Sequence, residues 1–349
     1  RGIFVTEVKG GGFIAVGSTR SSGEGEEDVY LVRTDAQGQE LWSATFGGSA
    51  PDFGWSVCEV ADGFVIAGFT ESFGEGENDF YLVKTTREGD EVWSRTFGGE
   101  GNDRCWALTP TADGGLLLVG ETTSFGAGEQ DVHLVKTDAQ GDLQWTKTHG
   151  GEKSDRVFAV ALAEDGFVLA GQTYSEGEGD RDAYVMKVSA GGDVSWSRTF
   201  GGEASDVAHY VVRTDDGNFM VTGYTTSFAQ NGDDPYLIKI DRQGNSLWTK
   251  VIPLDGVNHT ISGDQAADGG FYLVGFTEFE PRRPKAALLV KTDPAGEPVW
   301  HRNFVIDKWG ETFGYTVRGL VDGGCVFTGH TTGKGGQLDL HLVRVHGED

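Results

Sequence analysis

A tryptophan in the same local setting recurs every 51 or 52 residues along the chain. A second pattern, a glycine-containing turn before an apolar run, occurs seven times, for example as GGFIAVG, DGFVIAG and DGGLLLVG. Periods of this size are typical of solenoids, propellers and other arrays. Because each unit packs only on its neighbours, the repeats predict a single domain over residues 1–349 built from seven units. The recurring tryptophans are Trp42, Trp93, Trp145, Trp196, Trp248 and Trp300.

Within one unit, apolar residues follow a period of two, which is typical of β-strands. In residues 52–99 the segments FGWSVCEV, FVIAGFT, DFYLVKT and EVWSRTF are separated by loops and turns rich in Asp, Gly and Asn. Short turns of this composition favour hairpins, so the four strands form an antiparallel meander. Seven such units predict an all-β fold, a seven-bladed β-propeller of four-stranded antiparallel blades. A solenoid would need shorter parallel units, and sandwiches would need Greek-key connections.

Three segments carry a resemblance to a known group of propellers. TDAQGQELW, TDAQGDLQW and TDRQGNSLW resemble the Asp-x-x-Gly-x-x-x-Trp docking motif of quinoprotein-like propeller repeats. The chain also resembles secreted bacterial and archaeal repeat proteins with DGGF and WxxTFGG signatures. The resemblance implies tryptophan wedges between blades and an extracellular or cell-surface location, and it implies no particular activity. Quinoprotein dehydrogenase activity is disfavoured because the vicinal cysteines often found beside the quinone are absent.

The seventh unit departs from the others at its end. After HLVRV no tryptophan-containing strand follows, so we expect the last blade to lack its outer strand unless another segment supplies it. The missing strand could have preceded Arg1 in the native protein. An open sheet edge would be a site for strand pairing with another chain.

The formal charge of −26 argues against binding to nucleic acid or anionic membranes, which need a basic face. No apolar run approaches the roughly 18 residues that span a bilayer, so membrane insertion is not expected. The three cysteines lack CxxC spacing, and we expect no zinc site and no cofactor. Alternating carboxylates in the Gly-rich loops could bind calcium; the alternative is that these loops are simply solvated. The candidate metal ligands are Glu176, Glu178, Asp180 and Asp182.

Two polar positions recur in most or all units, so we interpret them as architecture. A cation in the third strand is expected to pair with carboxylates or lie over an aromatic ring. An aspartate before the third strand is expected to accept backbone hydrogen bonds in the Gly-rich turn. The cations are Arg33, Lys84, Lys136, Lys187, Lys239, Lys291 and Arg344, and the aspartates are Asp28, Asp79, Asp131, Asp182, Asp234 and Asp339.

Candidate ligand residues belong to the face with the long, variable loops, because loops on a rigid scaffold carry function. Aligning the first strands brings Ile3, Trp55, Trp106, Phe158, His209, Ile261 and Tyr315 into one register. These rings could stack on sugars or peptide side chains, or fill the space between blades. A basic island, Arg282, Arg283 and Lys285, with Trp309, His259 and Glu311 on irregular connections nearby, could bind an anionic ligand such as an acidic polysaccharide. Its alternative role is an internal salt bridge.

These features predict a non-enzymatic extracellular or cell-surface binding or scaffold propeller that recognises a glycan or protein. One alternative is a polysaccharide lyase or hydrolase at the channel mouth, for which His209, His259, Tyr315 and Arg283 would supply acid–base and charge-neutralising groups. A second alternative is a structural repeat domain of a larger surface protein. The propeller fold alone supports neither lyase nor hydrolase activity.

Overall fold

The computed structural model describes residues 1–230, 232–279, 284–307, 310–333 and 338–347. Across these residues the chain forms 27 β-strands and no helix, which confirms the all-β prediction. Accordingly, the described residues contain no helix that is long and apolar enough to span a membrane. The chain divides into two compact units, Arg1–Phe158 and Ala159–Asp349, each described separately. The prediction of a single domain stays a prediction.

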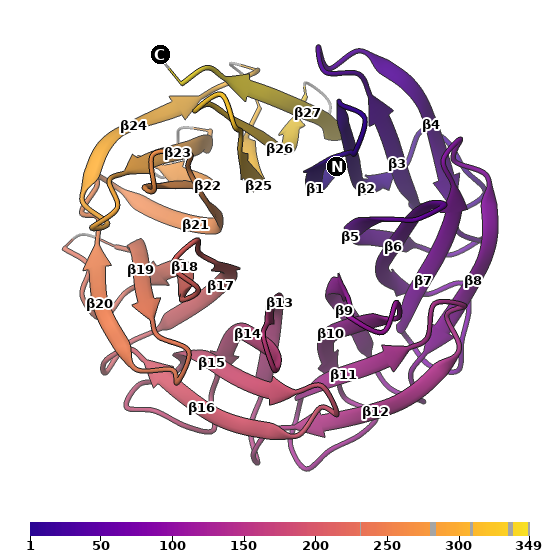
Figure 1. Cartoon of the computed structure of the whole chain (residues 1–349), viewed down its shortest axis with the longest axis horizontal. Helices are drawn as coiled ribbons and strands as arrows, with labels where there is room; N and C mark the ends of the chain where they lie inside the picture. The colour runs from indigo at the N-terminus through magenta and orange to yellow at the C-terminus, as the bar shows by residue number, and fades with distance from the viewer. Residues whose placement is uncertain (231, 280–283, 308–309, 334–337, 348–349) are drawn as a thin grey trace. The chain divides into compact units, whose positions relative to one another are not determined.

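The first unit holds three four-stranded antiparallel sheets, each with its strands paired in chain order (Figure 1). The first sheet comprises β1 (Gly2–Glu7), β2 (Phe13–Thr19), β3 (Asp28–Thr34) and β4 (Glu40–Phe46). The second comprises β5 (Asp52–Val60), β6 (Gly63–Thr70), β7 (Asp79–Thr86) and β8 (Glu91–Phe97). The third comprises β9 (Asp103–Pro110), β10 (Leu116–Thr122), β11 (Asp131–Thr137) and β12 (Leu143–His149). Strand β5 contacts both β1 and β9, so neighbouring blades of this unit meet at their first strands.

The boundary between the units falls in β13 (Asp155–Ala163), which pairs in a fourth sheet with β14 (Gly166–Thr173), β15 (Asp182–Ser189) and β16 (Val194–Phe200). The fifth sheet comprises β17 (Asp206–Arg213), β18 (Phe219–Thr225), β19 (Asp234–Ile240) and β20 (Ser246–Val251). The sixth comprises β21 (Val257–Gln265), β22 (Phe271–Glu278), β23 (Ala286–Thr292) and β24 (Pro298–Phe304). The last sheet comprises β25 (Thr312–Gly319), β26 (Cys325–Thr332) and β27 (Leu338–Val345).

These seven antiparallel meanders make the fold a seven-bladed β-propeller, as predicted. In the seventh sheet the described residues supply three strands, in the order β25-β26-β27. The further expectation that another chain pairs with this sheet gains no support from the structure.

The core of each unit lies between neighbouring sheets, because the middle strands are buried on both faces. Every residue of β6, β10 and β14 is buried. In the first unit, Val65, Ala67 and Leu82 of the second sheet pack with Cys105 and Leu118 of the third. Cys105 is therefore a small buried hydrophobic residue, and its burial raises the pKa of its thiol.

The strand-four tryptophans dock against the next sheet, as the resemblance implied. Gly141, at a φ of +80°, lies under the Trp93 ring, and a Cβ atom there would come within 2.6 Å of that ring. A side chain at this position would therefore displace the tryptophan. Comparable contacts join Trp42 to Gly89, Trp196 to Gly244 and Trp248 to Gly296.

The first strands carry an irregularity that the sequence did not reveal. In six of them one residue is left out of the pairing register with the second strand, as a β-bulge. A bulge bends the strand and re-aims the side chain that it carries. The bulge positions are those aligned from the sequence: Ile3, Trp55, Trp106, His209, Ile261 and Tyr315.

Candidate functional site

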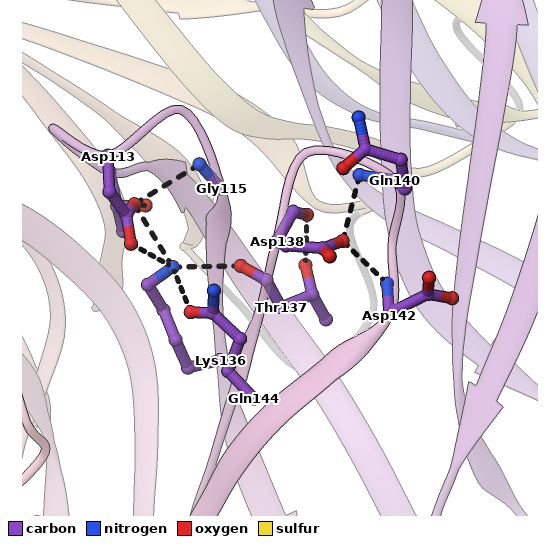
Figure 2. Close-up of polar contacts among 9 residues, drawn as sticks. Asp113, Gly115, Lys136, Thr137, Asp138, Gln140, Asp142 and Gln144 are labelled. Atoms are coloured by element: carbon purple, nitrogen blue, oxygen red, sulfur yellow. Dashed lines mark hydrogen bonds and ion pairs between the residues drawn. The ribbon is translucent and has the colours of Figure 1, made fainter.

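Six of the seven recurring cations of the third strands pair with carboxylates, as predicted, whereas Arg33 donates to the backbone carbonyls of Phe13 and Gly11. Lys136 Nζ lies 3.0 Å from Asp113 Oδ2 and donates to the Thr137 carbonyl at 2.8 Å and to Gln144 Oε1 at 3.0 Å (Figure 2). The neighbouring Asp138 Oδ1 accepts backbone hydrogen bonds within its own turn. Each lysine thus forms an ion pair with a carboxylate of its own sheet. The other such pairs are Lys84 with Asp62, Lys187 with Asp165, Lys239 with Asp216, Lys291 with Asp268 and Arg344 with Asp322.

The aspartates before the third strands also serve their own loops. Asp79 Oδ2 accepts the backbone N–H groups of Glu75 at 2.9 Å and Gly76 at 3.3 Å. Asp182 likewise accepts from Gly179 at 3.0 Å, while Glu176, Glu178 and Asp180 are exposed. In the part of the chain that the structure describes, no three His, Cys, Asp or Glu side chains come together as a metal site. Calcium binding by this loop stays a prediction.

In the first unit the predicted aromatic residues pack on one another. The rings of Trp55 and Trp106 meet edge to face, with centroids 4.6 Å apart at 89°. Phe69 and Phe158 extend this cluster, at 5.7 Å and 6.3 Å from Trp106, and the Arg104 guanidinium lies 5.4 Å from the Phe69 ring. Half-buried rings in edge contact leave only part of each face for a ligand.

In the second unit a continuous series of rings crosses three sheets. His209 lies 5.7 Å from Tyr224, and Tyr224 stacks on His259 at 3.9 Å and 14°. His259 is 4.7 Å from Phe276, which lies 5.2 Å from Phe313. Phe313 contacts Tyr315 at 6.4 Å and His330 at 4.9 Å. We call this series the ring ladder: His209, Tyr224, His259, Phe276, Phe313, Tyr315 and His330.

Charged groups of both signs flank the ring ladder. Arg181 donates to the Tyr224 hydroxyl at 2.7 Å, and His259 Nε2 lies 2.6 Å from Asp233 Oδ2. Lys285 Nζ lies 4.9 Å from the Phe276 ring centroid, 5.5 Å from that of Phe313 and 3.9 Å from Glu278 Oε2. Lys285 therefore makes an internal ion pair and also cation–π contacts.

The other predicted members of this sector are placed only in part. Arg282, Arg283 and Trp309 lie outside the described residues. The placement of His259 on an irregular connection was wrong, because it lies within β21. Glu311 is half-buried and donates its backbone N–H to Thr332 Oγ1 at 2.7 Å.

Burial keeps His209 and His259 of the ladder neutral. Desolvation, with smaller contributions from His259 and Arg181, lowers the pKa of His209 to about 3. Desolvation also lowers the pKa of His259, although the hydrogen bond to Asp233 opposes it. At neutral pH both imidazoles are uncharged, so they are suited to stacking and hydrogen bonding and poorly suited to donating a proton as an acid.

Sequence reasoning missed four of the seven ladder rings, but a signal for three of them was present. Each second strand has a glycine followed by a residue that differs from unit to unit. The differing residues are Ser18, Phe69, Glu121, Gln172, Tyr224, Phe276 and His330. Tyr224, Phe276 and His330 are ladder rings. Variation at one position of an otherwise uniform repeat therefore marks this surface.

Fold and site together define the class of protein: a tryptophan-docked β-propeller whose units differ at a row of ring and charged positions. The chain belongs to the family whose model is described as outer membrane protein assembly factor BamB, which matches residues 26–276. Among curated proteins it is 26% identical over 192 residues to the regulatory protein FlaEY of Caulobacter vibrioides. That match covers 45% of this chain and only 20% of FlaEY, so the chain spans about a fifth of that relative.

Solved structures support the fold alone, because their identities to this chain are low. BamB from Moraxella catarrhalis has a TM-score of 0.50 and 14% identity, over 98% of this chain and 84% of that chain. Puromycin hydrolase has a TM-score of 0.55 and 16% identity, over 98% and 52%. Sqt1 from Chaetomium thermophilum has a TM-score of 0.51 and 13% identity, over 97% and 85%.

Proposed function

We propose that the chain is a binding or scaffold propeller whose ring ladder recognises a segment of another protein. The observation that carries this proposal is the row of rings, five half-buried and two buried, flanked by Arg181 and Lys285 and by Asp233 and Glu278. A peptide presents apolar side chains together with positive and negative charges. The rings, carboxylates and cations of the ladder can contact these three kinds of group respectively. A uniformly anionic polysaccharide would meet the carboxylates as well as the cations.

The family supports a binding role in general terms, since its description names an assembly factor. The finer alternatives remain separate hypotheses: a glycan ligand, a structural role in a larger surface protein, and a polysaccharide lyase or hydrolase using His209, His259, Tyr315 and Arg283. An extracellular or cell-surface location is part of the proposal.

The test is selection of peptides from a displayed library, combined with native electrophoresis through gels containing neutral or acidic polysaccharides. We expect selected peptides to lose about tenfold in affinity in Lys285→Gln and in Tyr224→Leu. The matched control is Lys250→Gln, which removes a cation on β20 that pairs with Glu297. Its affinity is expected to stay unchanged.

Three outcomes would contradict the proposal. Retardation in one polysaccharide gel without clearing would favour a glycan ligand, and clearing of the polysaccharide would favour the lyase or hydrolase. Peptide binding that is insensitive to both ladder variants would move the binding surface elsewhere.

A further inference from the structure

A cavity of about 380 Å³ lies between the second and third sheets of the first unit, away from the ring ladder. Its walls include Phe97, Phe125, Leu143 and Thr146, and His133 of β11. Cavities of this size accommodate small organic molecules. Phe125 and Leu143 are about half exposed, so the cavity has an apolar mouth.

The cavity exists because the third sheet departs from the repeat at one position. The third residue of the third strand is a tyrosine in four sheets: Tyr30, Tyr81, Tyr184 and Tyr236. In the second sheet Tyr81 packs beside Phe73, with centroids 5.7 Å apart. In the third sheet the corresponding pair is His133 and Phe125, at 5.6 Å. An imidazole is smaller than a phenol ring and leaves space.

The sixth sheet provides an independent check of this explanation. Its third strand has Leu288 at the same position, again in place of tyrosine. A second cavity, of about 260 Å³, is lined by Leu288 and Phe279. Space between sheets therefore opens at two of the three positions where the tyrosine is replaced, those of His133 and Leu288; the third is His341 in the seventh sheet.

His133 lines the larger cavity and carries one buried, unpartnered ring nitrogen. The residue is 2% exposed, and its Nε2 lies 2.8 Å from Thr146 Oγ1. Its Nδ1 is buried and has no hydrogen-bond partner among the residues that the structure describes. Burial lowers the pKa of His133 to about 4, against the opposing influence of Asp103, so the ring is neutral at pH 7. The neutral ring therefore adds a polar, uncharged group to the wall that faces Phe125 and Thr146.

The charge of the cavity is negative. Asp79 and Glu75 line it, and its lining within the described chain includes no Lys or Arg. Asp79 is 2% exposed, and burial, together with the nearby carboxylates of Asp103 and Glu75, raises its pKa. A cation in the cavity would stabilise the ionised form of Asp79.

We propose that this cavity binds a small organic cation, an amine with an apolar body, whose ammonium group lies by Asp79 and Glu75. The apolar body occupies the space that a tyrosine fills in four other sheets, against Phe97, Phe125 and Leu143. This site is distinct from the ring ladder and does not depend on the proposed function.

The test is an NMR titration of the whole chain with 2-phenylethylamine, followed at the His133 imidazole. Neutral 2-phenylethanol and anionic phenylacetate serve as isosteric controls. We expect the amine to bind about tenfold more tightly than the alcohol, and phenylacetate not to bind. Equal affinity for the three probes, or no shift with the amine, would overturn the proposal.

Variants separate cavity binding from general stability. His133→Tyr restores the residue of the other sheets and is expected to abolish amine binding without lowering Tm. The matched control Tyr184→Phe, in the second unit, is expected to keep binding. Glu75→Gln and Asp79→Asn are expected to reduce the preference for the amine over the alcohol. Because Glu75→Gln keeps the backbone hydrogen bond to Asp79, it carries the test if Asp79→Asn destabilises the fold. Amine binding that survives His133→Tyr would place it elsewhere.

Discussion

The Nε2 atom of His259 lies 2.6 Å from Oδ2 of Asp233, while its ring stacks on Tyr224 with centroids 3.9 Å apart. The carboxylate raises the pKa of this imidazole, and burial lowers it by more. Asp233→Asn removes the opposing influence, so we expect the His259 pKa to fall further. The measurement is the pH titration of the imidazole resonances by NMR. Asp255→Asn, at an exposed position, is the control, and a rise of the His259 pKa in Asp233→Asn would contradict the assignment.

The buried histidines predict a loss of stability in acid. The folded pKa of His133 is about 4, below its value of about 6.5 in an unfolded chain, so the folded state binds fewer protons. Its contribution is fully present above about pH 6.5 and is lost as the pH falls toward 4, by up to about 3 kcal/mol. Urea unfolding across this range should show a smaller loss in His133→Tyr than in the wild type. Parallel curves would show that His133 is not the titrating group.

Tryptophan docking predicts different costs at two glycines with similar backbone. Gly141 and Gly114 have φ values of +80° and +84°, but only Gly141 has a neighbouring ring, that of Trp93, within 4 Å of a Cβ atom. Alanine at either site costs about 1 kcal/mol in backbone strain. We expect Gly141→Ala to lower the free energy of unfolding by a further ~1–3 kcal/mol, the usual cost of overpacking. Equal losses in urea unfolding would mean that Trp93 moves aside freely.

The ion pair between Asp113 and Lys136 (Figure 2) is expected to contribute modestly to the free energy of unfolding. A hydrogen bond from Thr111, followed by one from Lys136, lowers the pKa of Asp113 to about 2. This contribution is present above about pH 3.8 and is lost as the pH falls toward 2. The Asp113 side chain is 56% exposed and Lys136 keeps other acceptors, so we expect Asp113→Ala to cost about 1 kcal/mol at neutral pH.

The comparison for that pair is Asp142→Ala, which removes a more exposed ion pair with Arg95. Its cost is expected to stay within about 0.5 kcal/mol. Equal costs for the two variants in chemical denaturation would show that the burial of Lys136 adds nothing to the interaction.

Strand positions and their hairpin pairing could be predicted from the sequence, because the alternation of apolar residues and the turn chemistry of Asp and Gly are local properties. The docking role of Trp93 and the ion pairing of Lys136 were also accessible, since both features recur with the repeat. His209, His259 and Tyr315 were singled out from alignment of the units. Their ring partners Tyr224 and Phe276 stand at the variable position after the second-strand glycine, but that pattern does not give the contacts between neighbouring sheets, which depend on register and bulges.

The sequence by itself determined the repeat, the all-β class, the seven blades and the replacement of tyrosine by His133 in one of them. Only the tertiary structure decided what that replacement means. Phe125, Leu143 and Asp79 lie on other strands or loops, and packing between two sheets brings them around the imidazole. Packing between sheets is a property of side-chain volumes in three dimensions, so a missing phenol ring becomes a cavity only where neighbouring sheets cannot close over it.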